Sequence, residues 1–123
     1  MSVPADIKKL LTRFASSRGT RNTEFSNAAP CKWQPTATTD PRTKQPFTDD
    51  NAWEYIIEYI DNGTKIYKII LKKPAGKIGY TMLLPSIHSD RPIYIKLQIC
   101  GDHVKGRSFH YCEQGIDPGE DAD

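Results

Sequence analysis

Two stretches of the chain space their apolar residues as an amphipathic α-helix does. In residues 4–17 and 48–61, apolar positions recur at i, i+3, i+4 and i+7, which forms one stripe along a helix. Thr48 is a suitable N-cap for the second helix, and Asp49 and Asp50 suit the positive end of its dipole. The stripes are Ile7, Leu10, Leu11 and Phe14 in the first helix and Trp53, Ile56, Ile57 and Ile60 in the second.

After Gly63 the hydrophobic period changes from 3.6 to 2, which predicts β-strands. The clearest strand is 93–100, which alternates isoleucine and leucine with polar or aromatic residues. Gly101-Asp102 after it is a hairpin turn signal. The predicted strands are 65–71, 78–84, 93–100 and 104–111.

The order of these elements predicts an α+β fold, with two N-terminal helices packed on one face of a four-stranded, mainly antiparallel sheet. The length of 123 residues fits a single domain, which we place at residues 1–112. Residues 18–47 have neither period and contain four prolines, so we expect a long basic connection draped over the core. It could serve nucleic-acid binding or be a plain solvated loop. Residues 113–123 are rich in Gly and acid, which predicts a disordered acidic tail.

Charge is distributed unevenly along the chain. The formal net charge is only +2, but residues 113–123 hold five of the 15 acidic residues and no base. Residues 1–112 therefore carry 17 bases against ten acids, a formal charge of +7. A basic body with an acidic tail is compatible with a polyanionic partner, and equally with a charge that only keeps a small domain soluble.

The cysteines and the N-terminal residues indicate a reducing cytoplasm. Cys31, Cys100 and Cys112 form no C-x-x-C pair, the chain starts without a signal-like segment, and no apolar stretch approaches the roughly 20 residues of a membrane span. A zinc site built from Cys100, His103, His110 and Cys112 is disfavoured, because the spacing matches no common pattern and strand alternation spreads these residues over different faces. We expect no metal, no other cofactor and no membrane partner.

The register of the last two strands decides which side chains share a face. A two-residue turn continued without interruption places Lys96 opposite Arg107, whereas a three-residue turn or a bulge places Lys96 opposite Ser108. We favour the second register, because it turns Phe109 into the core and His110 onto the open face.

The last strands carry the side chains that RNA cleavage by the 2′-oxygen requires. A base takes the 2′-hydroxyl proton, an acid protonates the leaving 5′-oxygen, and cations hold the phosphate. Histidine suits either proton transfer, arginine and lysine bind phosphate, and tyrosine is a weaker acid or a stacking surface. We expect RNA or phosphate contacts from Arg107, Lys77, Lys73, Tyr94 and Ser108.

Three short motifs carry a resemblance to a known family: Gly79-Tyr80-Thr81-Met82, Ile93-Tyr94-Ile95-Lys96 and the closing Ser108-Phe109-His110. With them, residues 53–112 resemble the sheet half of RelE-like ribonuclease toxins. The motility quorum-sensing regulator toxins of bacterial toxin–antitoxin pairs are the most similar.

The resemblance implies a metal-independent endoribonuclease that binds messenger RNA on its sheet surface and is neutralised by an antitoxin protein. By position, it assigns the catalytic places to His110, Lys96 and Tyr80, with Arg107 beside them. The family usually has Lys where His110 stands, and it has no counterpart for residues 18–47.

Two other functions fit the same sequence. The basic sheet face could belong to a non-catalytic module that grips nucleic acid or an acidic protein. The chain could also be a plain interaction protein, such as an antitoxin-like or phage accessory protein, in which Lys96 and Arg107 form a solvated face around a partly buried His110.

Overall fold

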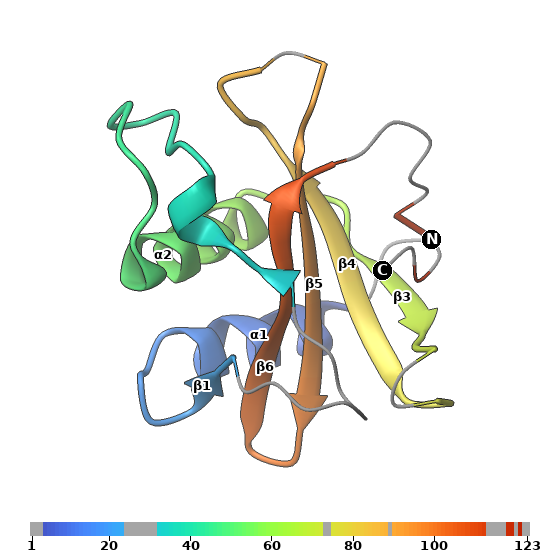
Figure 1. The fold of residues 1–123 in the computed structure, drawn as a ribbon. Helices are drawn as coiled ribbons and strands as arrows, with labels where there is room; N and C mark the ends of the chain where they lie inside the picture. The colour runs from blue at the N-terminus through green and yellow to red at the C-terminus, as the bar shows by residue number, and fades with distance from the viewer. Residues whose placement is uncertain are drawn as a thin grey trace.

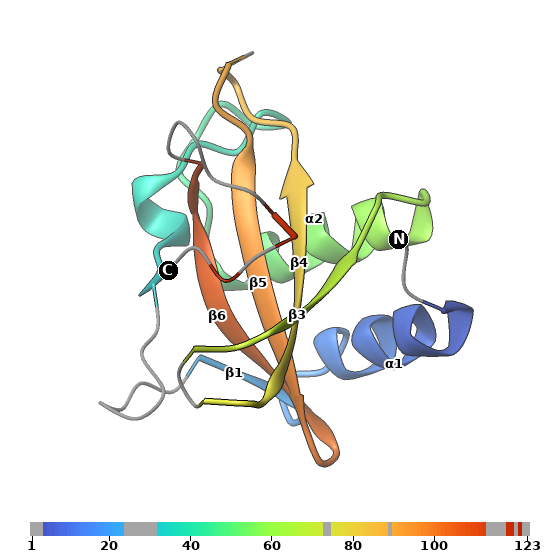
Figure 2. The same cartoon turned by 90° about the vertical axis from the view of Figure 1, so that its right-hand side faces the viewer.

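A computed structural model describes residues 4–23, 32–72, 75–88, 90–112, 118–119 and 121. Helices α1 (Ala5–Ala15) and α2 (Asp49–Asp61) lie on the same side of the strands (Figure 1, Figure 2). Thr48 caps α2 as predicted, since its hydroxyl oxygen accepts a hydrogen bond of 3.1 Å from the N–H of Asn51. The predicted α+β class is confirmed.

The four predicted strands are present and form antiparallel neighbours. Strands β4 (Ile78–Leu84) and β5 (Ile93–Cys100) have the predicted bounds. Strand β3 (Tyr67–Ile70) is shorter than predicted, and β6 (His103–Tyr111) starts one residue earlier. Their order across the sheet is β6-β5-β4-β3, so each strand pairs with its sequence neighbour (Figure 1).

The prediction of a four-stranded sheet is wrong in one respect. The sheet is six-stranded and mixed, because β1 (Arg21–Asn22) and β2 (Lys32–Trp33) both pair with β6 in parallel. These strands and the 3-10 helix η1 (Pro35–Ala37) come from the connection between the two α-helices. Strands of two residues are too short to display a hydrophobic period, so the sequence pattern could not reveal them.

The hydrophobic core lies between the helices and one face of the sheet. The helices contribute their predicted stripes, including Leu11 and Phe14 from α1 and Trp53 and Ile56 from α2, all of them buried. Burial of each such side chain is worth about 1.5–3 kcal/mol, so the orientation of this sheet face is strongly fixed. The sheet contributes Met82, Leu84, Ile93, Ile95, Leu97, Val104 and Phe109.

The hairpin between β5 and β6 combines both features that the sequence left as alternatives. Gly101 and Asp102 form a two-residue turn, with Cys100 opposite His103 and Gly101 at a φ of 63°. Further along, the register shifts by one residue. The turn therefore starts one register and the shift converts it to the other.

Arg107 is the extra residue of this β-bulge. Leu97 is opposite Gly106, whereas Lys96 is opposite Ser108, so no residue of β5 is left to face Arg107. From this point on, β6 has the register favoured from the sequence. Its side chains exchange faces relative to those of an uninterrupted hairpin.

Asp40 orders the loop that leads into α2. Its side chain is fully buried and accepts hydrogen bonds of 2.8 Å from both the backbone N–H and Nη2 of Arg42. The guanidinium of Arg42 also lies 4.9 Å from the ring centre of Tyr55 on α2. Burial raises the pKa of Asp40, but the hydrogen bonds from Arg42 outweigh it, so the pKa lies below its usual value.

We predict that Arg42→Met destabilises the fold more than Asp40→Asn does. Loss of Arg42 leaves a buried carboxylate without a counter-charge, at a cost of about 3 kcal/mol. Loss of the Asp40 charge leaves an Arg42 side chain that is 36% exposed and also reaches Glu58, so we expect a cost of about 1 kcal/mol. Urea unfolding of the two variants measures both values, and the reverse ranking would contradict this account.

The same pair predicts how stability depends on pH. Because folding lowers the pKa of Asp40, its contribution is present at neutral pH and is lost as the pH falls below about 4. The free energy of unfolding of Asp40→Asn should therefore change less between pH 6 and pH 3 than that of the wild type. Equal pH dependence in the two proteins would show that Asp40 makes no such contribution.

Candidate functional site

One row of residues crosses the sheet on the face opposite the helices. Lys32 on β2 pairs with Ser108 on β6, and Ser108 pairs with Lys96 on β5. Lys96 in turn pairs with Thr81 on β4. Paired residues project from the same face of a sheet, so the row brings the predicted residues Lys96 and Ser108 together with Lys32.

His110 and Tyr94 form the next row on this face. They are paired across β5 and β6, and their ring centres are 5.6 Å apart. Since side chains two residues apart on a strand share a face, His110 projects on the same side as Lys96. The structure thus places the imidazole and the ammonium on one face of the sheet.

Much of this face is buried, whereas the sequence suggested an open surface. Tyr94 and Ser108 have no exposed area, and Lys96 is only 5% exposed. The described residues of the C-terminal tail take part in this burial: the hydroxyl of Thr81 donates a hydrogen bond to the carbonyl oxygen of Pro118, and Lys96 pairs with the tail. The other residues of the tail that was predicted to be disordered lie outside the described residues.

Tyr80 lies on the other face of the sheet, which corrects its expected place beside Lys96 and His110. It pairs with Leu97 and belongs to the hydrophobic core. Burial, and to a lesser extent Asp6 on α1, raise the pKa of its hydroxyl. The side-chain alternation of β4 is fixed by its pairing with β5, and that pairing turns Tyr80 toward the helices.

The remaining predicted contacts are scattered. Lys77 is exposed in the link before β4, next to Ile78, which pairs with Ile70 near the end of β3. Leu83, five residues further along β4, faces Tyr94, so Lys77 lies roughly 17 Å or more along the sheet from the His110 row. Arg107 is 1% exposed in the bulge, and Lys73 lies outside the described residues.

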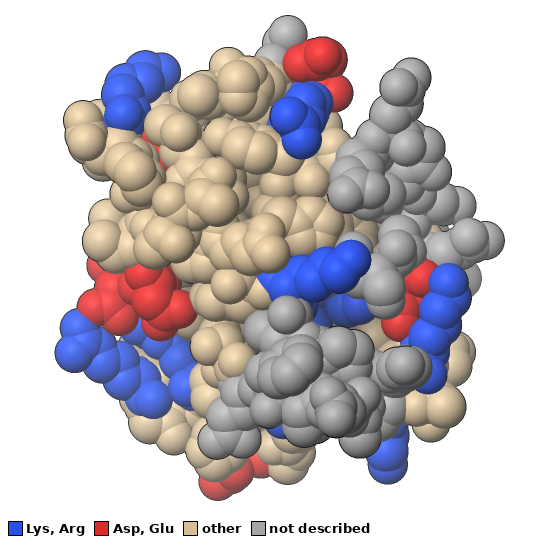
Figure 3. Space-filling model, viewed as in Figure 1, with Lys and Arg blue, Asp and Glu red and all other residues tan. Residues whose placement is uncertain are grey.

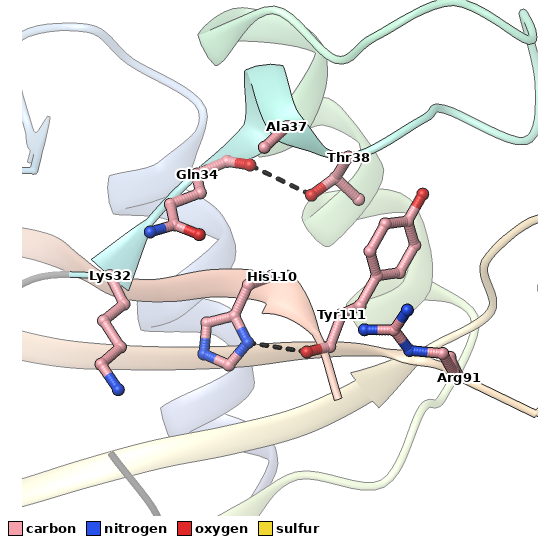
Figure 4. Close-up of a pocket in the computed structure, with 7 residues that line it drawn as sticks. All are labelled: Lys32, Gln34, Ala37, Thr38, Arg91, His110 and Tyr111. Atoms are coloured by element: carbon pink, nitrogen blue, oxygen red, sulfur yellow. Dashed lines mark hydrogen bonds between the residues drawn. The ribbon is translucent and has the colours of Figure 1, made fainter. Parts of the chain in front are cut away.

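A pocket of about 320 Å³ lies where β2 and η1 meet the end of β6. Figure 4 shows His110 and Tyr111 along one wall, with Lys32 and Arg91 at the two ends. The residues that line it are Lys32, Gln34, Ala37, Thr38, Arg91, His110 and Tyr111.

The hydrogen bonding of His110 fixes the role of each ring nitrogen. Nδ1 lies 2.8 Å from the carbonyl oxygen of Tyr111 (Figure 4). A carbonyl oxygen can only accept, so Nδ1 carries the hydrogen, and Nε2 is the proton-accepting nitrogen of the neutral ring. Figure 4 shows Nε2 on the side of the ring that faces Lys32.

Tyr111 connects the pocket to the loops around it. Its hydroxyl oxygen accepts a hydrogen bond of 3.1 Å from the backbone N–H of Thr39. The guanidinium of Arg91 lies 5.1 Å from its ring centre, and the ring of His88 packs against it edge-on at 5.1 Å. Arg91 is therefore held at the pocket by a cation–π contact, which is worth about 0.5–1 kcal/mol at an exposed site.

The pocket favours an anion. Two cationic side chains, Lys32 and Arg91, line it, and none of the described lining residues carries a carboxylate. On the face seen in Figure 3, a group of Lys and Arg side chains lies near the centre, and the visible acidic side chains lie toward the margins. The arrangement suits phosphate groups that contact the cations at the two ends, with a proton-accepting nitrogen between them.

Sequence reasoning missed Lys32 and Arg91 as members of one site with His110. Lys32 belongs to the segment interpreted as a basic connection, and its neighbours Cys31 and Trp33 are among the apolar residues expected to anchor that connection. Arg91 precedes Pro92 at the start of β5, where no periodic pattern singles it out. Among the described residues, no group of His, Cys, Asp or Glu side chains is arranged to hold a metal ion.

Trp33 holds β2, and with it Lys32, against the rest of the domain. Its ring stacks on Trp53 at 4.7 Å and meets Phe109 edge-on at 5.3 Å. Its indole N–H donates a hydrogen bond of 2.9 Å to Asp49. The ring also lies against Gly106, where an added Cβ would be only 2.6 Å from two of its carbon atoms.

We predict that Gly106→Ala destabilises the protein by about 1–3 kcal/mol, because the methyl group would push the Trp33 ring out of its place. Gly19→Ala is the matched control, since the nearest heavy atom to a Cβ there is 3.7 Å away. Urea unfolding with tryptophan fluorescence measures the stability and the indole environment together. Equal stability of the two variants would show that Trp33 does not need the glycine.

Comparisons with protein-family models, with curated proteins and with solved structures find no match to this chain. In the part of the chain that the structure describes, no helix has the length and apolar character needed to cross a bilayer.

Proposed function

We propose that this protein is an endoribonuclease that binds RNA at the His110 pocket and cleaves it without a metal. The observation that carries the proposal is the combination of one oriented imidazole with Lys32 and Arg91 in one pocket. The resemblance to RelE-like toxins, which includes Ser108-Phe109-His110, points to the same chemistry.

Lys32 would bind the scissile phosphodiester beside His110, and Arg91 would bind a neighbouring phosphate of the RNA. Arg91 can hold two phosphate oxygens through paired N–H donors, and Lys32 neutralises the charge as a point cation. Lys32 stabilises the additional negative charge that develops on the phosphate oxygens in the transition state. Figure 4 shows the two cations at opposite ends of the pocket with His110 and Tyr111 between them, so each would contact a different phosphate of one RNA strand.

His110 would start the reaction as the general base. Nε2 takes the proton of the 2′-hydroxyl, the 2′-oxygen forms a bond to phosphorus, and the bond from phosphorus to the 5′-oxygen breaks. The leaving oxygen takes a proton from water, so the products are a 2′,3′-cyclic phosphate and a 5′-hydroxyl. The Tyr111 carbonyl keeps the hydrogen on Nδ1 and stabilises the charged ring once it has accepted the second proton.

An antitoxin would neutralise such an enzyme by covering the same pocket. The resemblance implies an inhibitory protein partner, and the cations of the pocket favour an acidic segment in it. A protein with unchecked ribonuclease activity would stop the growth of its host cell, which gives the partner a physiological role.

A non-catalytic RNA-binding module is the second candidate. Two of the three expected catalytic side chains are not available as expected: Tyr80 faces the core and Lys96 is buried in an ion pair. The pocket then has one imidazole as its only titratable group near neutral pH among the described lining residues. Binding alone needs no more than the two cations.

We predict that His110→Ala lowers the rate of RNA cleavage about 100-fold, because the general base is lost, while RNA binding stays within about threefold. His103→Ala at the opposite end of β6 is the control and should keep the wild-type rate. The assay follows a labelled oligoribonucleotide and analyses its new ends. A DNA strand of the same sequence should remain intact, since it has no 2′-hydroxyl.

Three outcomes decide between the two functions. Cleavage that depends on His110 and leaves 2′,3′-cyclic phosphate ends supports the endoribonuclease. RNA binding without cleavage by the purified wild type supports the binding module. Cleavage by His110→Ala at the wild-type rate would show that this pocket is not the active site.

We also predict that Lys32→Gln weakens RNA binding and reduces its salt dependence by about one released counterion per oligonucleotide. Lys44→Gln, at an exposed position in the loop before α2, is the control for the loss of one positive charge. Fluorescence anisotropy at several salt concentrations gives the slope. Equal slopes for the two variants would show that Lys32 does not contact a phosphate.

A further inference from the structure

We propose that the sheet has a second anion-binding subsite, formed by Lys96 and the backbone N–H of Lys72, which binds a phosphate of the RNA and is occupied here by the chain's own Asp121. This inference rests on the proposed RNA binding at the His110 pocket and adds a contact with a second phosphate of the same RNA strand. It also assigns a function to the acidic C-terminal tail, which competes for the subsite.

Asp121 uses both carboxylate oxygens in this subsite. Oδ1 lies 2.7 Å from Nζ of Lys96, and Oδ2 accepts a hydrogen bond of 2.7 Å from the backbone N–H of Lys72. The two charged side chains are only 6% and 2% exposed. A carbonyl oxygen of the tail, that of Pro118, accepts the hydrogen bond from Thr81 in the same row.

These contacts are the ones that a phosphodiester would make. Like a carboxylate, a phosphodiester carries one negative charge spread over two oxygens, so one can accept from Lys96 and the other from the N–H of Lys72. Removal of an ammonium and a carboxylate from water is costly, and their mutual attraction repays this cost only incompletely. Exchange of one anion for the other keeps the Lys96 ammonium paired with a negative charge, which avoids the cost of an uncompensated buried charge.

The subsite lies close to the pocket. Lys96 and Lys32 occupy the same row, with only Ser108 of β6 between them. At about 4.8 Å between strands, their Cα atoms are roughly 10 Å apart. A single RNA strand that places one phosphate at Lys32 can therefore place another near Lys96.

Asp121 belongs to the same chain as Lys96, and this covalent connection decides which ligand can displace it. An attached carboxylate has an effective concentration in the millimolar range, so a free anion with weak intrinsic affinity for the subsite competes poorly with it. An RNA strand that is already bound at the His110 pocket also holds its next phosphate close to Lys96. That phosphate and the Asp121 carboxylate therefore compete at similar effective concentrations. The ligand class is therefore an oligonucleotide, and inorganic phosphate alone should bind weakly.

The test measures binding of a fluorescein-labelled 2′-O-methyl oligoribonucleotide, which cannot be cleaved, to Asp121→Asn. The control is Asp102→Asn, since the Asp102 side chain is 84% exposed in the β5–β6 turn and its loss changes the net charge equally. We expect Asp121→Asn to tighten binding roughly fivefold or more beyond the control. In a Lys96→Met background, this additional gain should disappear.

Equal affinities of Asp121→Asn and Asp102→Asn would overturn the subsite, as would a gain that persists without Lys96. Amide NMR spectra and thermal unfolding establish that each variant is folded. If Asp121→Asn or Lys96→Met does not fold, Asp121→Ala or Lys96→Gln takes its place. If Asp121→Asn gains affinity but the protein does not cleave natural RNA, the subsite is supported and the nuclease function is contradicted. If the protein cleaves RNA but Asp121→Asn gains no affinity, the nuclease function is supported and the subsite is contradicted. If no variant binds the oligonucleotide, both proposals are contradicted.

Discussion

The packing of Trp33 on Trp53 and Gly106 is the contact on which the candidate site depends. Strand β2 has only two residues, and its ladder with β6 would be marginal without a buried anchor. The stacked indole supplies that anchor, and Lys32, the residue that precedes Trp33, therefore lies in the same pocket as His110. The pocket is therefore a consequence of tertiary packing at the edge of the sheet, since no local sequence motif brings its two cations together.

The bulge at Arg107 is the second constraint, because it decides which face each side chain of β6 takes. In an uninterrupted hairpin, His110 would turn toward the helices and Phe109 would lose its place opposite Ile95. The additional residue gives Phe109 a fully buried position in the core and leaves His110 at the pocket. Burial of one phenylalanine thus positions the imidazole, which couples the stability of the core to the geometry of the site.

The sequence predicted the elements that have enough residues to show a period. Both α-helices, the four longer strands and the register of the last hairpin follow from hydrophobic spacing and the preference for Phe109 in the core. Strands β1 and β2 were missed because two residues show no alternation. Tyr80 was misplaced because the resemblance assigned it to the site by position, whereas strand alternation puts it on the same face as Met82 and Leu84, which lie in the core. The grouping of Arg91 with His110 depends on contacts between distant parts of the chain, which a single sequence does not reveal.

The two cationic positions on the sheet differ in what they require of a ligand. Lys32 and Arg91 are exposed side chains at the ends of their pocket, so a ligand meets them from solvent. Lys96 is buried, and a buried ammonium needs an anion at all times, because an uncompensated charge there would be costly. The tail provides that anion through Asp121. An RNA strand would then meet the pocket first and reach Lys96 only by exchange with Asp121, so the acidic tail would weaken RNA binding at the buried lysine while it stabilises the protein without RNA.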